Sequence, residues 1–211
     1  MSGLLDLLNG PIGKTLIQGA SAKAGQSEGD TANVLSMALP VLMGAMKKNV
    51  QTPEGAAGLM GALSGKHSGG ILDQLGDLMG NGGPSDDVLQ DGAGILGHLL
   101  GGNQPQVENA LSSKTGMDAG SIAQILKVAA PVLMGVLGKQ TQQNNVSDGS
   151  GMNALLGSML GGQPKENQSL ITTLLDSDGD GSILDDVAGM VLGSSKGKGG
   201  IGGLLGGLFG K

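Results

Sequence analysis

The feature that most constrains this chain is a stretch that occurs twice. Residues 21–46 and residues 112–137 align without a gap at a constant offset of 91, and 12 of the 26 aligned positions are identical. The identical positions include the run PVLMG, which spans 40–44 in the first copy and 131–135 in the second. A match of this kind along one chain indicates a duplicated unit, so each half is expected to fold as a variant of one motif.

The spacing of apolar residues within the repeated stretch predicts helices. In the first copy Val34, Ala38 and Val41 recur at intervals of three to four, which places them on one face of an α-helix. No segment of the chain alternates apolar and polar residues at period two with β-branched enrichment. The predicted fold class is therefore all-α, with Pro40 and Pro131 kinking the two long helices because proline removes a backbone donor.

Glycine, proline and capping residues predict where the helices begin and end. Asp30 or Thr31 is expected to cap the long helix of the first copy and Asp118 that of the second, because such side chains accept hydrogen bonds from first-turn N–H groups. Residues 71–79 are expected to form one helix and residues 144–151 a loop. Further helices are expected over 3–10, 11–24, 53–63, 85–100, 105–114 and 152–160, and from Pro164 to about Leu175.

The duplication divides the chain into a first helical repeat, 1–83, a second repeat, 84–198, and a tail, 199–211. The chain also contains a shorter repeat. GILGHLLG at 94–101 and GLLGGLFG at 203–210 match in residue type, and residues 3–10 are less similar to both. The first two instances stand directly before a repeat unit. If each element docks on the unit that follows it, the third has no unit to dock on within its own molecule.

Composition narrows the function classes. The formal net charge is −6, all 12 basic residues are lysine, and the chain has no Arg, Trp or Tyr. Nucleic-acid binding relies on a basic face with arginine or stacking aromatic side chains, so that class is excluded. The absence of cysteine removes disulfides and thiolate metal sites.

Glycine makes up 43 of the 211 residues and is interleaved with apolar residues. We interpret most of it as close packing between helices, which small side chains permit, at a cost of about 1 kcal/mol of helix propensity per glycine relative to alanine. In the tail, Gly199, Gly203 and Gly207 recur every four residues, as in a glycine zipper.

The sequence predicts neither a secretory signal nor a membrane span. The N-terminus lacks a basic region and carries Asp6 within its apolar stretch. The longest apolar runs are about a dozen residues, which is too short for the roughly 30 Å of a bilayer core. The protein is therefore expected to be cytoplasmic or exported by a route that uses no signal peptide, and any membrane contact is expected to be peripheral.

The chain resembles the YidB-like bacterial family, domain of unknown function 937. The resemblance is carried by the paired PVLMG runs at 40–44 and 131–135, the LGxxLGG-like element at 96–102, and the loop DSDGDGSILDD at 176–186. It implies an all-helical fold and no assigned activity.

The loop at 176–186 also has the pattern of an EF-hand or dockerin calcium loop. Asp176, Asp178 and Asp180 occupy positions 1, 3 and 5, which supply carboxylates, and Gly181 occupies position 6, where the chain turns sharply. Ser182 at position 7 would contribute its backbone carbonyl oxygen. This spacing predicts a calcium site with weak affinity, about 10⁻⁴–10⁻³ M.

The loop departs from the calcium pattern at its end. Position 12, where a bidentate carboxylate belongs, is Val187, and the acids Asp185 and Asp186 come one and two residues earlier. Either one of these two aspartates must reach the calcium ion in place of the missing position-12 carboxylate, or a water molecule must complete the coordination shell. The alternative is a solvated turn in which Asp185 or Ser182 caps the following helix. The corresponding segment of the first copy, 80–87, lacks the alternating acids, so only the second copy is expected to bind calcium.

No catalytic constellation stands out. His67 is expected in a loop, solvated, and His98 on an apolar helix, packed, with no neighbouring ligands that would hold zinc. The segment at Gly13 lacks the glycine spacing and preceding strand of a phosphate loop. The chain is therefore expected to be non-enzymatic.

These observations predict a structural, self-associating calcium-binding protein that assembles with copies of itself. The C-terminal glycine zipper of one molecule would dock on the next, which yields filaments, or rings if the rotation closes. One alternative is a peripheral membrane or envelope-associated protein whose leucine-rich segments insert at a lipid surface. A third is an enzyme with a site built from scattered acids.

Overall fold

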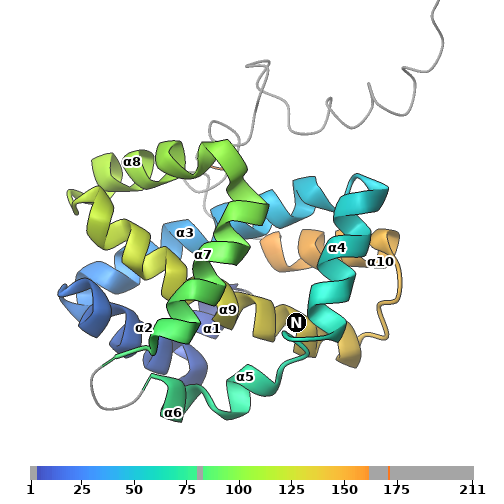
Figure 1. The fold of residues 1–211 in the computed structure, drawn as a ribbon, viewed down its shortest axis with the longest axis horizontal. Helices are drawn as coiled ribbons and strands as arrows, with labels where there is room; N and C mark the ends of the chain where they lie inside the picture. The colour runs from blue at the N-terminus through green and yellow to red at the C-terminus, as the bar shows by residue number, and fades with distance from the viewer. Residues whose placement is uncertain (1–3, 80–82, 162–170, 172–211) are drawn as a thin grey trace, which may run out of the picture.

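The computed structural model describes residues 4–79, 83–161 and 171, and every regular element within them is a helix (Figure 1). The all-α prediction is confirmed for this part of the chain. The first half contains α1 (Leu4–Asn9), α2 (Pro11–Ala24), α3 (Glu28–Asn49), α4 (Pro53–Ser64), α5 (Gly70–Asp73) and α6 (Leu75–Leu78). The second contains α7 (Asp86–Leu100), the 3-10 helix η1 (Gly101–Asn103), α8 (Gln104–Thr115), α9 (Ala119–Gln143) and α10 (Gly149–Leu160).

The core is built around α9. This helix packs against α2, α3, α4, α5, α7 and α8, and every residue from 128 to 138 is buried. By length and composition, helix α9 is long and apolar enough to cross a membrane. The prediction from sequence rested on uncharged apolar runs of about a dozen residues, and Lys127 divides this helix into shorter runs of that kind. However, 72% of its most apolar window is buried inside the protein, as is typical of a core helix.

The two long helices run uninterrupted through their prolines. Helix α3 passes through Pro40 and α9 through Pro131, and both prolines are buried. The kink expected at each of them stays a prediction. Each proline lies in the repeated PVLMG run, so the two copies place the same apolar run at the centre of the molecule.

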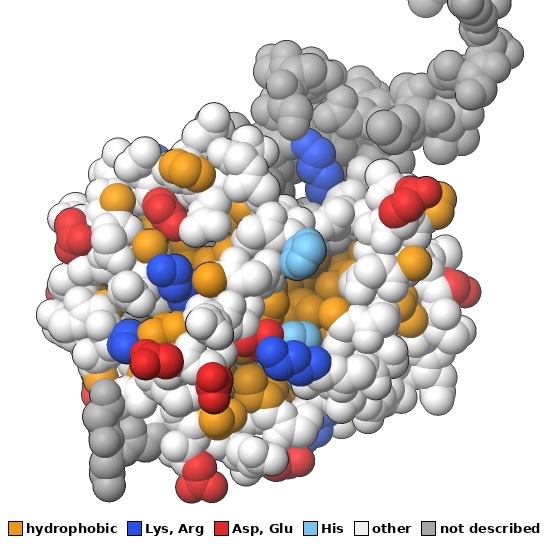
Figure 2. All heavy atoms as spheres, viewed as in Figure 1, with side chains coloured by type: hydrophobic (Ala, Val, Ile, Leu, Met, Phe, Trp, Pro, Cys, Tyr) orange, Lys and Arg blue, Asp and Glu red, His pale blue; other side chains and the backbone are white. Residues whose placement is uncertain are grey.

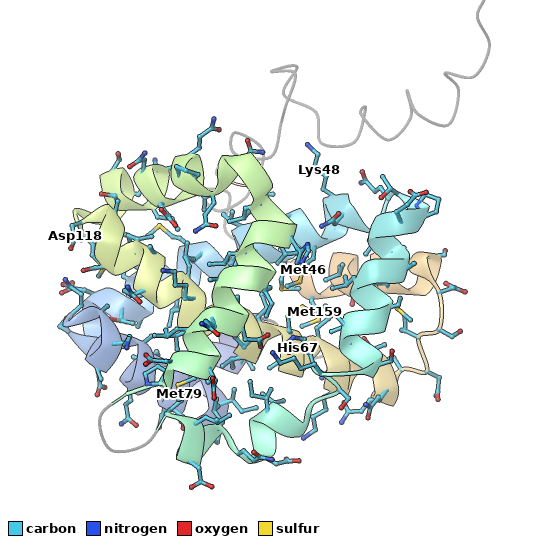
Figure 3. All side chains as sticks on the ribbon, viewed as in Figure 1. Met46, Lys48, His67, Met79, Asp118 and Met159 are labelled. Carbon is cyan, nitrogen blue, oxygen red and sulfur yellow. The ribbon has the colours of Figure 1, made fainter. Side chains whose placement is uncertain are left out.

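The halves share one core. Helix α2 of the first half packs on α9 of the second, and the helix that follows the long helix of each half lies on the long helix of the other: α4 packs on α9, and α10 packs on α3. Met46 of α3 and Met159 of α10 are both buried in this shared core (Figure 3). The apolar surface of each half is therefore covered largely by the other.

The helix boundaries of the two halves correspond. The C-cap residues of α2 and α8 are Gly25 and Gly116, which are 91 residues apart and both left-handed, with φ of 65° and 76°. The N-caps of the long helices, Ser27 and Asp118, have the same separation. Helices α4 and α10 each have 12 residues and begin after a capping side chain.

The cap predicted for α3 was wrong by one turn, whereas that of α9 was right. The N-cap of α3 is Ser27, whose Oγ accepts a hydrogen bond from the Asp30 N–H at 3.1 Å and donates one to Asp30 Oδ2 at 2.7 Å. This reciprocal pair satisfies a first-turn donor and extends the helix back past Asp30. Asp118 caps α9, accepting from the Ser121 N–H.

Two other boundaries differ from prediction. Residues 71–79 form two short helices, α5 and α6, separated at Gln74, whose φ of −103° and ψ of 6° leave the helical range. Helix α10 begins at Gly149, inside the predicted loop, because the side chain of Asp148 accepts a hydrogen bond from the Gly151 N–H at 2.8 Å.

Glycine permits close helix contacts at defined positions. A Cβ at Gly92 of α7 would overlap the backbone carbonyl of Lys127 in α9, and one at Gly138 of α9 would overlap that of His67. At these positions the expected small-residue packing occurs. Other glycines have open space beside them, and two of those, Gly58 and Gly94, lie on facing sides of α4 and α7.

Candidate binding groove between α4 and α7

A groove of about 960 Å³ lies between α4 and α7. The two helices form its walls, and Met134 of α9 contributes to its floor. In the space-filling view, apolar side chains lie exposed within this hollow, with the two histidines along it (Figure 2). The α4–α7 groove is larger than three other cavities in the described part of the chain, whose volumes are about 540, 490 and 320 Å³.

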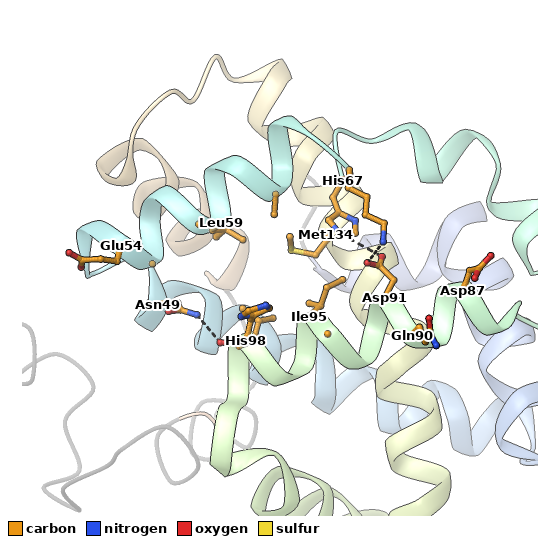
Figure 4. A pocket seen from close by; sticks show the side chains of 16 residues that line it. Asn49, Glu54, Leu59, His67, Asp87, Gln90, Asp91, Ile95, His98 and Met134 are labelled. Atoms are coloured by element: carbon orange, nitrogen blue, oxygen red, sulfur yellow. Dashed lines mark hydrogen bonds and ion pairs between the residues drawn. The ribbon is translucent and has the colours of Figure 1, made fainter.

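The middle of the groove is apolar. Leu59 and Ala62 line it from α4, Ile95 and Leu99 from α7, and Met134 from α9 (Figure 4). Methionine adapts its shape to different partners, which favours its use at binding surfaces. A concave apolar surface of this size with polar groups at its ends is typical of a binding site.

Two glycines leave the walls of the groove open. Gly58 of α4 and Gly94 of α7 both line it, and a Cβ at either position would meet no atom within 4 Å. One turn further along, Gly61 and Gly97 are equally unobstructed but do not line the groove. The first pair therefore provides space within the groove, and the second pair provides a matched comparison.

One end of the groove is closed by a cluster of three charged or titratable side chains, which we call the His67 cluster: Lys66, His67 and Asp91. Asp91 of α7 accepts a hydrogen bond from Lys66 Nζ at 2.6 Å, and its other oxygen lies 3.6 Å from His67 Nε2. The side chain of Lys66 is 71% exposed, whereas those of His67 and Asp91 are 6% and 15% exposed. The cluster thereby joins the turn after α4 to the wall formed by α7.

His67 is buried, contrary to the expectation of a solvated loop residue. Its backbone N–H donates a hydrogen bond to the Ala62 carbonyl at 3.0 Å, so the chain turns back at the end of α4 and directs the ring inward. Its Nδ1 is buried and has no hydrogen-bond partner. Burial lowers the pKa of His67 below its usual 6.5, the nearby Asp91 carboxylate opposes that shift, and the charge of Lys66 adds to it.

The other end of the groove carries His98, which is exposed rather than packed as expected. It lies in the last turn of α7, where its side chain lines the groove beside Leu99 (Figure 4). The His98 backbone carbonyl accepts a hydrogen bond from the Asn49 side-chain amide at 3.3 Å. Glu54, at the start of α4, lies at this end as well.

Carboxylates therefore lie at both ends of an apolar groove. Glu54 is at the end with His98, and Asp87 and Asp91 are at the end with the His67 cluster (Figure 4). Glu54 and Asp87 are both exposed to solvent. Asp91 is already paired with Lys66, so Glu54 and Asp87 are the carboxylates that remain without an ion pair among the described residues, one at each end. This arrangement favours a ligand with an apolar body and positive charge at both of its ends.

The described residues that line the groove include no hydroxyl or thiol side chain. Of its neighbours in the cluster, His67 pairs with Asp91, while the charge of Lys66 opposes protonation of the ring. Among the described residues, no group of three or more His, Asp or Glu side chains is placed to hold a metal ion. What these residues can do together is bind an apolar partner and orient its polar ends.

The predicted calcium ligands cannot be compared with this site. Asp176, Asp178, Asp180, Ser182, Asp185 and Asp186 lie outside the described residues, as does the glycine zipper at 199–211. The calcium site therefore stays a prediction from sequence.

Sequence reasoning missed the groove, although it noted both histidines. The groove forms because α4 belongs to the first half and α7 to the second, and their separation is set by how both pack on α9. No local signal separates Gly58 and Gly94 from the glycines at close helix contacts, because the difference appears only when the packed helices are in place.

Comparison of the sequence with protein-family models identifies a family to which the chain is similar. The family model described as bacterial protein of unknown function (DUF937) matches residues 6–140 and 142–211. No curated protein and no solved structure matches the chain.

Proposed function

The chain belongs to this family of bacterial proteins of unknown function, and we propose that it is a non-enzymatic, self-associating protein. In this proposal the α4–α7 groove of one molecule takes up the glycine-zipper tail, residues 199–211, of another. The observation that carries it is an apolar groove with open glycine positions in its walls and carboxylates at both ends. A helix laid into an apolar groove is a recurring mode of peptide recognition.

The charge of the tail complements that of the groove. From Val187 to Lys211 the chain has no acidic residue, and its lysines flank the apolar run: Lys196 and Lys198 precede it, and Lys211 follows it. These positions match the carboxylates at the two ends of the groove. Opposite charges at both ends would fix the position of the apolar run along the groove.

Length and composition agree with this occupant. The 13 residues 199–211 would span about 20 Å as a helix, close to the roughly 18 Å of the 12-residue α4. Glycine on one side of such a helix allows close approach to the walls, and Ile201, Leu204 and Leu208 supply apolar surface for the floor. The match in residue type between 203–210 and 94–101, which forms the end of α7, also supports a helical, docked form.

The duplication predicted from sequence is part of the same proposal. Its support is the equal spacing of the caps at Gly25 and Gly116 and at Ser27 and Asp118, together with the reciprocal packing of α4 and α10. A contact between the tail of one molecule and the groove of the next is heterologous, so repeating it builds a filament or a closed ring.

Calcium binding at 176–186 is retained as a proposal on the sequence pattern alone. Calcium would offset two of the five negative charges of this loop and fix the direction of the tail that follows. Isothermal titration of the protein with calcium chloride tests this, and heat changes no larger than those of buffer at millimolar calcium would refute it.

Filling the groove tests the proposed function. The double variant Gly58→Leu, Gly94→Leu places two side chains inside the groove, whereas Gly61→Leu, Gly97→Leu adds the same side chains to the same helices outside it. Both pairs should stabilise their helices, because leucine has the higher helix propensity. We expect the first variant to be monomeric by multi-angle light scattering, and the second to assemble as the unmodified protein does.

The opposite pattern would overturn the proposal. If the groove-filled variant assembles like the control pair, the groove is not the acceptor. Deleting 199–211 should give the same monomer as filling the groove. If that deletion leaves the mass distribution unchanged, the tail is not the occupant.

Liposome flotation distinguishes the peripheral membrane alternative. Protein that floats with phosphatidylcholine vesicles through residues 199–211 would favour a lipid surface as the partner of this segment. If the tail instead docks in the groove of a second molecule, the protein should stay in the soluble fraction.

A further inference from the structure

We propose that the turn between α4 and α5, residues 65–69, closes one end of the groove in a pH-dependent way: protonation of His67 releases the 65–69 turn from α7, and its release weakens docking. This inference rests on the proposed function, since it assumes that the groove takes up residues 199–211 of a second molecule. It adds a regulation of that site and the residue through which the regulation acts.

The 65–69 turn separates two cavities. Lys66, His67 and Asp91 line the α4–α7 groove, and the same three residues line a second cavity of about 320 Å³. None of the other residues that line the second cavity is titratable: Ser68, Gly70, Ile71, Gln74 and Leu78. If the turn moved away from α7, the groove would lose the wall at this end and open into the second cavity. A docked segment would then lose the contacts that this wall provides.

Exposed polar contacts hold the 65–69 turn on the rest of the protein. Lys66 Nζ donates a hydrogen bond to Asp91 at 2.6 Å, and the Ser68 carbonyl accepts one from the Gln142 side-chain amide at 2.8 Å. Gly69 ends the turn with a φ of 106°, a conformation that glycine adopts without steric cost. Segments held by exposed hydrogen bonds open at a lower free energy than a buried helical core. The turn can therefore be released while α4, α7 and α9 stay folded.

His67 is the buried part of this turn. Its side chain is 6% exposed, and its Nδ1 is enclosed by the protein without a hydrogen-bond partner. The neutral ring can direct its single N–H towards Asp91, which lies 3.6 Å from Nε2, and leave Nδ1 as an acceptor. The protonated ring has an N–H at both nitrogens, so Nδ1 becomes a buried donor without an acceptor. In water both donors are satisfied, so protonation favours the released turn.

The charges around His67 offset this penalty only in part. Burial has the largest effect and lowers the pKa of His67, the Asp91 carboxylate of α7 opposes that shift, and the charge of Lys66 adds to it. Asp91 is also paired with Lys66. Lys139 of α9 is a further positive charge beside the end of the turn, and Asp87 of α7 is exposed to solvent. The pKa of His67 in the closed turn therefore lies below 6.5.

Acid should therefore release the turn. A His67 side chain in water has a pKa of about 6.5, above its pKa in the closed turn. The closed turn has its full stability above about pH 6.5 and loses stability as the pH falls below that value, by up to about tenfold in the opening equilibrium per pH unit. The loss ends once His67 protonates within the closed turn. Carboxyl groups in water titrate at about pH 4, so a comparison of about pH 7.5 with about pH 5 reports mainly on histidine.

Hydrogen exchange of the full-length chain, followed by mass spectrometry, measures the release. The His67 amide donates to the Ala62 carbonyl, so its exchange reports on the turn. After correction for the intrinsic pH dependence of exchange, we expect residues 65–69 to be less protected than α9, and their protection to fall at least about fivefold between about pH 7.5 and about pH 5. Protection equal to that of α9, or unchanged with pH, would overturn the proposal.

The variants His67→Phe and His67→Leu have no group at this position that can be protonated. In both of them the protection of residues 65–69 should stay nearly constant over the same pH range. A fall as large as that of the unmodified protein would show that another group drives the release, and the proposal would be wrong.

Two variants of the neighbouring charges should change the response in opposite directions. Lys66→Gln removes a positive charge that lowers the pKa of His67, so the total fall in protection should be smaller. Asp91→Asn removes a negative charge that raises this pKa, so the fall should be larger. A purely structural role of these side chains would not produce opposite changes. Changes in the same direction, or none, would overturn the proposal, and this comparison decides it if neither variant of His67 folds.

Sedimentation velocity of the His98→Gln variant, in which His67 is the only histidine, measures the effect on docking. We expect its association constant to fall at least about threefold between about pH 7.5 and about pH 5, and that of the double variant His98→Gln, His67→Phe to stay constant. The net charge of −6 diminishes over this range, which by itself favours association. The expected loss therefore runs against the general effect of charge.

Failure of this inference is distinguishable from failure of the proposed function. If acid releases the turn but assembly through the groove is equally strong at both pH values, the pH control is overturned and tail-to-groove assembly stands. If filling the groove with Gly58→Leu and Gly94→Leu leaves assembly unchanged at about pH 7.5, the proposed function is overturned, and the control of docking falls with it.

Discussion

At the scale of single residues, two side-chain atoms in the described part of the chain are buried without a hydrogen-bond partner, His67 Nδ1 and Thr31 Oγ1. The two differ in their surroundings. His67 lines the groove, but its Nδ1 is itself enclosed by the protein, whereas Thr31 lies in the first turn of α3 and is fully buried. The residue 91 positions further along is Ile122, so the second half has an apolar side chain where the first has a hydroxyl. Each of the two unpaired atoms therefore carries a stability cost.

The variant Thr31→Val should stabilise the protein. Valine has nearly the same shape and removes the unpaired hydroxyl, so the free energy of unfolding should rise by about 1 kcal/mol, measured by urea denaturation. Thr141→Val is the matched control, because Thr141 is also buried but its Oγ1 donates to the Leu137 carbonyl at 2.7 Å. A loss of stability at position 31 as large as at position 141 would contradict this expectation.

The histidines show what sequence can and cannot predict at this scale. His67 follows a helix in a polar, glycine-rich stretch, and nothing local indicates that its turn folds inward against α7. His98 lies among leucines, yet the helix directs it to the open side of α7. Both exposures depend on packing between distant segments. The cap at Asp118, in contrast, depends on its own first turn and was predicted correctly.

At the scale of elements, the contact between α7 and α9 determines the shape of the groove. Gly92 lets α7 approach so closely that a Cβ there would overlap the Lys127 carbonyl. The sequence predicted both helices and their approximate bounds, because their caps and apolar spacing are local. It did not predict which glycines serve contacts and which leave open space, because Gly92, Gly94 and Gly97 look alike without the helix packed beside them.

The variant Gly92→Ala should destabilise the protein by about 1–3 kcal/mol, because α7 must move away from α9 to make room for the methyl group. The control Gly97→Ala meets no atom within 4 Å, so it should instead add up to about 1 kcal/mol through helix propensity. Thermal unfolding of the two variants measures the difference. Equal stabilities would show that α7 and α9 do not approach each other this closely.

At the scale of the whole molecule, the two halves of the described chain share one core and leave a groove between α4 and α7. The all-α class was predictable because helical spacing pervades the chain. The groove was not, because it arises where an element of the first half faces one of the second. The proposed assembly joins this groove to an apolar, lysine-flanked tail, so a single molecule carries both a donor and an acceptor.

The central claim is tested most directly by mixing two variants that each lack one side of the contact. One has 199–211 deleted and keeps its groove, and the other carries Gly58→Leu with Gly94→Leu and keeps its tail. Sedimentation velocity should find each variant monomeric alone and a one-to-one dimer in the mixture, because one intact tail can meet one intact groove. A mixture that remains monomeric, or either variant still assembling alone, would contradict tail-to-groove assembly.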